Sequence, residues 1–529
     1  MSARARVVWE IAVRLCLLGD THVGAARAGP RHRTESDVDL RTDRDPRSGL
    51  PRLRASTLAG LLRHELATRS GDPERVRFLF GADEISEEPM TSALDVDDAL
   101  AELPEDFSIT TRVGIRVDPA SGTALPGRFR QWEVLPAGTF FTAHMRLWIP
   151  SHAEETQLLF LLLHAVTGLH GNAPGPHVGG RTVHGHGAVR ATRWSAARHD
   201  LTEEQGWFAH HARTWEQRWR ERAAALDEGP RTLTEALTTQ LRSAGLTTDA
   251  AHLAAHTIPS DRRRRAELRM RLAVAERTEP LSNDSECLSP GLLMVGETPG
   301  TTRHDRADRV HRHRPVVVDP DAPTVENAPV LGDTALYALF KRMASRIARD
   351  ACEQLGGRLE EQREWIAHWW GGDIDTTAPT PARVRLRDVP VIFGGAPLTV
   401  TRLTVDSLFG DAVDGHLFTS DLHCGGTAEV VLDVTDPDDA IRGLLALVVR
   451  DLATVAFDTL GADAGSGQGR LTALRARLTT HTGDDEPAHT VDLREALSDP
   501  HGCDAETVRS WVAALRAHLA PTDRGKGEE

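Results

Sequence analysis

Hydrophobic and polar residues alternate at the start of the chain. Residues 7–15 place every second side chain on one apolar face, which is typical of a half-buried strand. That face carries Trp9, Ile11, Val13 and Leu15. The same alternation returns further along the chain, with apolar positions at Leu268, Met270, Leu272 and Val274. The sequence therefore predicts an initial strand in each of two regions.

The first region continues with predicted elements in a definite order. They are a glycine turn at 19–24, a charged loop, a helix beginning near Ser56, a strand at 111–117, a hairpin at 127–141, a strand at 143–149, a buried helix at 153–167, a glycine-rich turn at 179–187 and a strand at 188–194. This order suits a ferredoxin-like βαββαβ sheet with helices on one face.

The same order returns from residue 262 onward. The recurring features are a turn at 292–296, an Arg- and His-rich loop at 303–314, a helix after Thr334, a hairpin, a buried helix at 439–457 and a glycine-rich turn at 461–470. In the two hairpins, the spacing from Gly127 to Glu133 (133 − 127 = 6) equals that from Gly415 to Asp421 (421 − 415 = 6). We interpret this as an internal duplication.

The predicted fold class is α+β, with two tandem ferredoxin-like or RRM-like domains that each carry a hairpin insertion and are joined by a helical connector. The domains are placed at residues 1–198 and 262–482, the connector at 199–261 and a C-terminal helical tail at 483–529. Four aromatic residues recur at helical spacing in the connector, and we interpret them as packing residues: Trp207, His211, Trp215 and Trp219.

Composition narrows the function. The formal net charge of −15 argues against a protein that coats nucleic acid indiscriminately, but it allows a basic groove on an acidic body. The five cysteines form no CxxC pair, which favours reduced thiols in a cytoplasm over a disulfide framework or a zinc ribbon. No apolar run reaches membrane-spanning length. We therefore expect a soluble, cytoplasmic protein without a membrane partner.

The loop and helix between Asp37 and Arg63 concentrate the candidate chemistry of the first region. Arg52 and Arg54 precede a helix N-terminus that carries Ser56 and Thr57, and Arg63 lies two turns into the helix. Free N–H groups, hydroxyls and guanidinium groups can together hold a phosphate. The alternative is a solvated loop that caps an ordinary helix.

At these residues the chain resembles the RAMP superfamily of CRISPR systems, as two fused copies of the backbone-forming subunit of type III effector complexes. The segments that carry the resemblance are Thr21–Gly24 (THVG), Arg44–Arg63, Phe78–Gly81 (FLFG), Trp132–Phe141 and the glycine-rich turn that ends each copy. The sequence departs from the family pattern where Arg54-Ala55 replaces Pro-Gly.

The resemblance implies a guide RNA (crRNA) lying across the sheet, a complementary target RNA and other CRISPR effector subunits as partners. It also implies a catalytic and metal-binding aspartate six residues before an Asp-Pro pair, and 45 − 6 = 39 gives Asp39, with Asp37 and Asp43 as alternates. The expected reaction is metal-dependent endoribonuclease cleavage, in which a 2′-OH attacks the adjacent phosphate. The cofactor would be a divalent cation, Mg or Mn, with no organic cofactor.

The predicted RNA contacts extend over both copies. They are His22, Arg52, Arg54, Ser56, Thr57, Arg63, Arg181, His184, His186, Arg312, His313, Arg314, Thr334, Lys341, Arg342, Gln468 and Arg470. In the second copy the same spacing, 319 − 6 = 313, gives His313 in place of an aspartate. We therefore expect a second copy that holds the guide without cleaving, with Asp308 as the reserve candidate.

Other functions remain open. The protein could be a non-cleaving scaffold of the same complex, or a guide-processing endoribonuclease that uses His184 or His186 as acid or base. It could also be an unrelated enzyme with the same sheet. A zinc site is conceivable at a histidine cluster, although no thiolates lie at metal-ligand spacing near it: His304, His311 and His313.

Overall fold

The computed structural model describes residues 6–24, 38–82, 90–117, 124–171, 174–259, 261–277, 288–297, 307–319, 324–372, 380–454, 457–483 and 487–521. The chain divides into two compact units. Unit 1 contains Met1–Thr182, His186–Arg263 and Pro315–Glu326, and unit 2 contains Val183–Gly185, Arg264–Arg314 and Asn327–Glu529. Both mix helices with antiparallel sheets, so the predicted α+β class is confirmed.

Unit 1 is built on an antiparallel sheet with the strand order β2-β4-β7-β1-β8, and β3 pairs with β7 beside this path. Its strands are β1 (Val7–Leu17), β2 (Arg52–Leu53), β3 (Leu94–Val96), β4 (Ala99–Glu102), β7 (Phe140–Ile149) and β8 (Val189–Asp200). A separate hairpin pairs β5 (Thr110–Val117) with β6 (Ala124–Val134).

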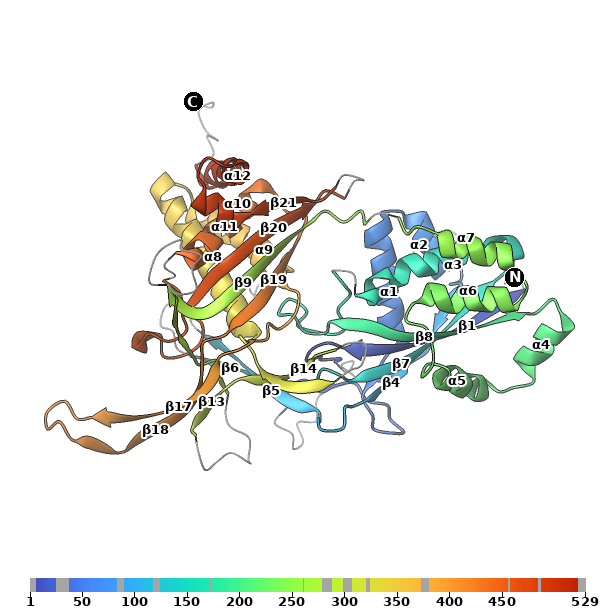
Figure 1. The fold of residues 1–529 in the computed structure, drawn as a ribbon, viewed down its shortest axis with the longest axis horizontal. Coiled ribbons are helices and arrows are strands. Elements are labelled where there is room, and N and C mark those ends of the chain that lie inside the picture. Colours follow the sequence, from blue (N-terminus) through green and yellow to red (C-terminus); the bar gives the residue numbers. More distant parts are fainter. Residues whose placement is uncertain are drawn as a thin grey trace. The chain divides into compact units, whose positions relative to one another are not determined.

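Helices cover both faces of the sheet in unit 1. They are α1 (Ala55–Ser70), α2 (Pro73–Phe80), α3 (His152–Val166), the 3-10 turn η1 (Thr167–His170), α4 (Glu204–His211), α5 (Trp215–Ala224), α6 (Leu233–Ser243) and α7 (Thr247–Ala255). In Figure 1, α1 and α3 lie on one side of β1 and α5 lies on the other. The apolar face of β1 enters the core with α1 and α3 as the alternation predicts, because Trp9, Ile11 and Val13 share one hydrophobic cluster with Leu62 and Leu162.

The second face of this sheet is covered by part of the connector. Trp219 of α5 packs edge-on against His144 of β7, with ring centroids 5.0 Å apart, and Arg146 lies over the ring of Trp215 at 4.4 Å. These two tryptophans are packing residues, as predicted. Glu10, on the same face of β1, is only 2% exposed. The expectation that RNA lies across the sheet is therefore wrong for β1, because neither of its faces is open.

Unit 2 has the same connectivity in its main sheet, β16-β19-β9-β20-β21, and β10 pairs with β9. Four strands correspond between the two sheets. In the order in which they lie side by side, β16, β19, β9 and β20 of unit 2 match β4, β7, β1 and β8 of unit 1. The strands are β9 (Arg265–Arg277), β10 (Leu288–Pro290), β16 (Val384–Leu386), β19 (Thr427–Thr435), β20 (Leu471–His481) and β21 (His489–Asp492).

A second sheet of unit 2 has the order β11-β18-β13-β12, and the long hairpin strand β17 pairs with β18. These strands are β11 (Leu292–Leu293), β12 (Gly296–Glu297), β13 (Arg309–His311), β17 (Ala396–Val405) and β18 (Ala412–Cys424). β14 (His313–Val317) and β15 (Val325–Pro329) form a separate two-stranded ribbon. Within unit 2, β17 and β18 extend away from β9 and β19 (Figure 1).

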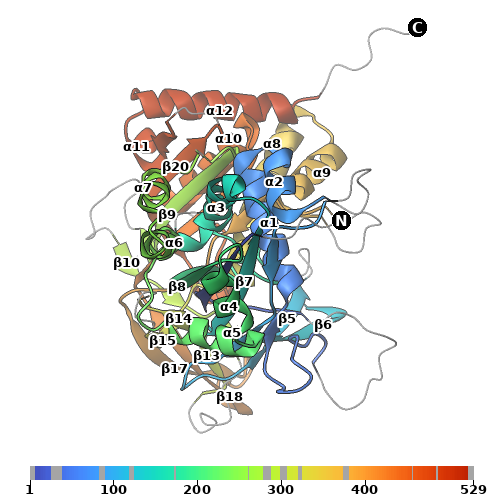
Figure 2. The ribbon, with the colours of Figure 1, turned by 90° about the vertical axis from the view of Figure 1, so that its right-hand side faces the viewer.

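The helices of unit 2 pack on one face of its main sheet. They are α8 (Thr334–Leu355), α9 (Leu359–Trp370), α10 (Asp439–Ala453), the 3-10 turn η3 (Ala464–Ser466), α11 (Leu493–Ser498) and α12 (Cys503–Leu519). Helix α12 lies beside α10 in both views (Figures 1 and 2). Gly443 of α10 permits this approach, because a Cβ there would lie 2.4 Å from the carbonyl oxygen of Trp511. Among the described helices, none combines the length and the apolar character that crossing a bilayer requires.

Some local predictions are wrong. The predicted hairpin at 127–141 does not form, because β6 pairs with β5 and the chain then continues through a turn into β7. The helix at 55 has no side-chain cap, since its N-cap residue is Arg54 and Ser56 lies within the first turn. Helices α2 and α7 were not predicted, because they are too short to show a clear helical periodicity in the sequence.

The glycine-rich turns of the two units make matching backbone contacts. In unit 1 a Cβ on Gly187 would lie 2.1 Å from the carbonyl oxygen of Val178, and in unit 2 a Cβ on Gly469 would lie 2.1 Å from that of Leu460. Both glycines have positive φ, 82° and 81°. Only glycine fits such positions without displacing backbone. The two turns therefore share individual backbone contacts, as expected if the sequence contains an internal duplication.

Gly187→Ala and Gly469→Ala should each destabilise their own unit, by roughly 1–3 kcal/mol or more, because strain at positive φ adds to a backbone clash. Thermal unfolding followed by circular dichroism measures the loss. Gly465→Ala is the matched control, because a Cβ there meets nothing within 4 Å. Equal melting temperatures for all three variants would contradict the assigned contacts.

Candidate functional site

Asp39 lies in the loop that runs beside β6. Its backbone N–H donates to the carbonyl oxygen of Gln131 at 3.0 Å, and its Oδ2 accepts the N–H of Gln131 at 2.8 Å. The side chain is otherwise exposed. The loop therefore presents this carboxylate to solvent while hydrogen bonds hold it in place. The alternate Asp37 lies outside the described residues.

Asp43, the other alternate, is buried in an ion-pair cluster. Arg54 donates to both of its carboxylate oxygens, at 2.6 and 2.9 Å, and Arg52 donates at 3.1 Å. The hydrogen bond from Arg54, with that from Arg52, holds the pKa of Asp43 below its ordinary 3.8. Since both oxygens are occupied, Asp43 acts as a link between the loop and β2 and is poorly placed to bind a substrate.

The phosphate cradle predicted at helix α1 is largely filled by the protein itself. Asp98 accepts the backbone N–H of Ala55 at 2.7 Å and also pairs with Arg52 at 3.1 Å. A carboxylate thus already occupies the helix N-terminus, where a phosphate would otherwise bind. Ser56 remains exposed, and Thr57 and Arg63 are half-buried on the same helix.

His22 and Glu133 form a buried junction behind the loop. The Nδ1–H of His22 donates to the carbonyl oxygen of Glu133 at 2.7 Å, and the Glu133 carboxylate accepts the N–H and hydroxyl of Thr42 at 2.9 and 2.8 Å. Burial lowers the pKa of His22. Burial alone would raise the pKa of Glu133, but hydrogen bonds from Thr42 and the charge of Arg44 outweigh it and lower that pKa. The junction fixes the loop onto β6.

Arg181 lies in the glycine-rich turn with a left-handed backbone, φ 62°. Its guanidinium sits over the ring of Trp132, 3.3 Å from the centroid. A bulky residue at positive φ is strained, and such strain is concentrated at functional sites. The predicted RNA contacts His22 and Arg181 therefore meet near β6, and His186 is buried close by.

His184 and His186 have different surroundings. The ring of His184 packs edge-on against Tyr337 at 4.9 Å. His186 is 1% exposed in unit 1. Its counterpart in the second glycine-rich turn is Gln468, also 1% exposed, whose side-chain nitrogen and oxygen have no hydrogen-bond partner within the described residues. Because His186 is buried and His184 is half-buried against Tyr337, the structure does not favour the alternative of a histidine-based processing nuclease.

The counterpart of Asp39 in unit 2 is Asp308. Its N–H donates to the carbonyl oxygen of Thr419 at 2.8 Å, and its Oδ2 accepts the N–H of Thr419 at 2.7 Å. Thr419 is two residues before Asp421, as Gln131 is two before Glu133. The spacing argument that placed His313 at this position is therefore wrong, because the two loops differ in length before their Asp-Pro pairs.

The residues around His313 are held by the protein. Arg312 donates to Asp333 at 2.8 Å, and the buried Arg314 pairs with Glu297 at 2.7 Å. His313 Nδ1 donates to the carbonyl oxygen of His311 at 2.9 Å. Burial lowers the pKa of His311 to about 3, and its ring centroid is 6.0 Å from that of His313. The third predicted zinc ligand, His304, lies outside the described residues.

The basic residues of α8, and Arg470 immediately before β20, also have partners. Lys341 donates to the carbonyl oxygen of Gly371 at 2.8 Å, Arg342 pairs with Asp458 at 2.9 Å, and Arg470 pairs with Glu276 at 3.4 Å. Thr334 is the first residue of α8. RNA could engage these side chains only by competing with existing ion pairs and hydrogen bonds.

Four arginines that the sequence analysis missed share one open face of the main sheet in unit 2. Arg269 lies directly across from Arg477, and Arg271 directly across from Arg475. All four are exposed, and like charges directly opposite each other are destabilising. In the first pair, Arg269 forms an ion pair with Glu267 at 2.8 Å, and Arg477 forms one with Asp492 at 3.1 Å. The period-two arginines at 269–271 and 475–477 were the signal in the sequence.

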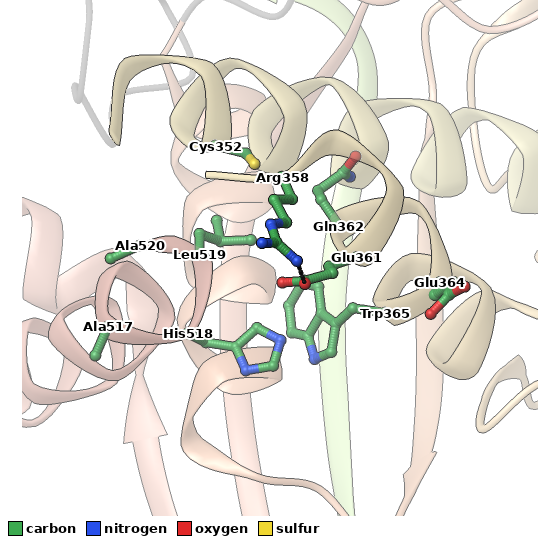
Figure 3. Close-up of a pocket in the computed structure, with 10 residues that line it drawn as sticks. All are labelled: Cys352, Arg358, Glu361, Gln362, Glu364, Trp365, Ala517, His518, Leu519 and Ala520. Carbon is green, nitrogen blue, oxygen red and sulfur yellow. Dashed lines mark hydrogen bonds and ion pairs between the residues drawn. The ribbon is translucent and has the colours of Figure 1, made fainter. Parts of the chain in front are cut away.

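A cavity away from these loops is lined by α8, α9 and the end of α12 (Figure 3). Its volume is about 450 Å³, and Arg358 is bonded to Glu361 across it at 3.1 Å. Cys352 lies at its edge, and burial raises the pKa of that thiol, which suppresses its reactivity. We therefore assign no chemistry to this cavity.

The structure gives limited support for a metal at Asp39. Within the described part of the chain, Asp39 is not joined by two further carboxylate, His or Cys ligands in a cluster. Mg²⁺ sites often use one or two carboxylates and draw their other ligands from substrate phosphates and water. The donor set therefore fits a cation only when RNA supplies further oxygens.

Comparison with known families gives one match. The RAMP superfamily model matches residues 15–190, from the end of β1 to the start of β8. The first part of the chain is similar to a RAMP domain. This segment contains Asp39, the His22–Glu133 junction and the first glycine-rich turn. A comparison with curated proteins finds no significant match.

Asp43→Asn should lower the melting temperature, because it removes the charge that Arg52 and Arg54 stabilise. The pKa of Asp43 is lower in the folded chain, so its contribution is present above the unfolded value and is lost as pH falls through the folded pKa. The difference in free energy of unfolding between the variant and the unmodified chain should be the same at about pH 7 and about pH 5. It should shrink only below pH 3.8. Urea unfolding at each pH measures it, and a difference that disappears at about pH 5 would contradict the pairing.

Proposed function

We propose that the protein is a guide-RNA-binding backbone subunit of a type III-like CRISPR effector complex that cleaves target RNA. The observation that carries this proposal is the pair of matching aspartates. Asp39 lies in the segment that resembles a RAMP domain, and Asp308 has the same two hydrogen bonds to a hairpin strand of unit 2. The partners would be a guide RNA, a complementary target RNA and other effector subunits.

The arrangement of strands supports the tandem architecture on which this function rests. Each unit follows the order β, α, β, β, α, β, with the sheet order of a ferredoxin-like domain and a hairpin inserted before the third main strand. The β17–β18 hairpin exposes Leu408 and Phe409 at its tip, 80% and 76% exposed. Apolar and aromatic side chains of this kind can stack on or wedge between bases.

Cleavage would use the exposed carboxylate of Asp39. Its Oδ2 is fixed by the N–H of Gln131, so the carboxylate is oriented before substrate binds. It could orient a 2′-OH of the target strand for attack on the adjacent phosphate. A bound Mg²⁺ or Mn²⁺ would stabilise negative charge on the nonbridging oxygens. Asp308 offers the same arrangement, so we extend the proposal to cleavage from both units.

A non-cleaving scaffold is the second candidate, and one observation favours it. The hydrogen bond that the N–H of Gln131 donates to Asp39 Oδ2 holds the loop against β6. This contact is a sufficient structural reason for an aspartate at that position. Asparagine retains an acceptor oxygen at the same place. Substitution by asparagine therefore separates a structural role from a catalytic one.

RNA should copurify when the chain is expressed with its neighbouring genes and a repeat array. The double variant Arg271→Glu with Arg475→Glu should lower the affinity for that RNA about tenfold or more. The reason is that two positive charges proposed to contact phosphates are reversed. The matched control is Arg349→Glu with Arg358→Glu, two exposed arginines on the helical side of unit 2. RNA recovered by extraction and filter binding measures the effect. Protein free of RNA would exclude both the nuclease and the scaffold.

Asp39→Asn and Asp308→Asn should each slow one of two cuts in the target RNA by about 100-fold or more. The amount of bound guide RNA and the melting temperature should stay unchanged. Labelled target RNA resolved on a gel identifies the lost product. Asp106→Asn, at an exposed turn of unit 1, is the control. If both asparagine variants cut like the unmodified complex, the scaffold function holds instead.

A further inference from the structure

A buried group of metal-ligating side chains lies on the second face of the sheet in unit 1. It consists of Glu10 on β1, His199 on β8 and His210 on α4. Glu10 is 2% exposed and His210 is 6% exposed. None of these residues belongs to the proposed RNA site. The pairing of Val8 with His199 places that histidine on the same face as Glu10.

The distances within this group are long: the hydrogen bond between His199 and Glu10 is at the outer limit of length, and His210 lies farther from the carboxylate. His199 Nε2 lies 3.4 Å from Glu10 Oε2, and His210 Nδ1 lies 3.7 Å from Glu10 Oε1. One ligand atom from each of the three residues falls within a 4.8 Å group. Tetrahedral zinc with ligand bonds of about 2.0–2.1 Å separates its ligand atoms by about 3.4 Å. The two distances run to different oxygens of Glu10, so the three ligand atoms, all within 4.8 Å of one another, would contract slightly to form three corners of a zinc site.

An unsatisfied nitrogen provides a second and independent observation. His210 Nδ1 is buried and has no hydrogen-bond partner within the described residues, although it points at the Glu10 carboxylate. A neutral imidazole nitrogen in this position could offer its lone pair to a metal. An unsatisfied buried polar atom in a native structure indicates a missing partner.

The Glu10 carboxylate also has a second partner, Arg218 of α5. Arg218 donates to Oε1 at 2.6 Å and leaves Oε2 toward His199. Such a donor orients a ligating carboxylate from outside the metal's coordination shell. Its positive charge also opposes a cation, which makes a metal-free hydrogen-bonded network the competing interpretation.

We propose that Glu10, His199 and His210 bind a structural divalent transition metal, with zinc as the best-suited ion, and that this metal fastens α4 to β1 and β8. A water molecule or an anion would complete a tetrahedral shell. The site would stabilise the cover over the second face of the sheet, and it is independent of whether unit 1 cleaves RNA.

The test uses the purified full chain without an affinity tag and the metal ion alone. Titration with Zn²⁺ after chelator treatment should give one tight site per chain, a higher melting temperature, and with Co²⁺ the visible absorption of a tetrahedral complex. His210→Ala should weaken zinc binding at least about 100-fold, because changes outside the coordination shell alone cost 10–100-fold. The control is His211→Ala, an exposed histidine on the same helix, which should bind zinc normally.

Two outcomes would overturn the proposal. The unmodified chain could show no tight zinc site and no thermal shift, which would establish the metal-free network held by Arg218. Zinc binding could also be equal in His210→Ala and the unmodified chain, which would place the ion elsewhere. If His210→Ala does not fold, the half-buried His199→Ala provides the second variant, and the Co²⁺ spectrum of the unmodified chain remains decisive.

Discussion

The close approach of backbone to backbone at the glycine-rich turns is the constraint on which each unit depends. Gly179 and Gly461 would each place a Cβ 2.1 Å from a carbonyl oxygen, that of His22 in unit 1 and that of Met294 in unit 2. The turn thereby holds the segment after the first main strand. The residue that follows, Val23 or Val295, accepts the N–H of Asp43 or Arg312 and so positions each loop. The candidate aspartates precede these bonds by four residues.

Neutralisation of charge decides which predicted residues are available for chemistry. Among the three aspartates considered, Asp43 is paired with two arginines, whereas Asp39 keeps an exposed carboxylate. Arg52 and Arg54 are engaged by the same pairing and are weak candidates for phosphate binding. Buried or paired charges contribute mainly to the local structure, because ligand binding must first break the existing contacts.

The two units differ most on the second faces of their sheets. In unit 1, α4 and α5 cover this face and bury Glu10 together with His144. In unit 2 the corresponding face exposes Arg271 and Arg475 to solvent. The same strand order therefore carries two different surfaces. Unit 1 encloses polar groups on this face, and unit 2 presents positive charge there.

Alternation and glycine spacing in the sequence determined the α+β class, the strands β1 and β9 and the buried helices α3 and α10, because these depend on local periodicity. Register across distant segments required the tertiary structure. The match of Asp308 with Asp39 follows from hydrogen bonds between residues about 90 to 110 positions apart. A spacing count fails there because loop length varies between the copies. The pairing of β6 with β5 in place of a hairpin at 127–141 was also settled only by the structure. The cluster of Glu10, His199 and His210 likewise exists only once β1, β8 and α4 meet.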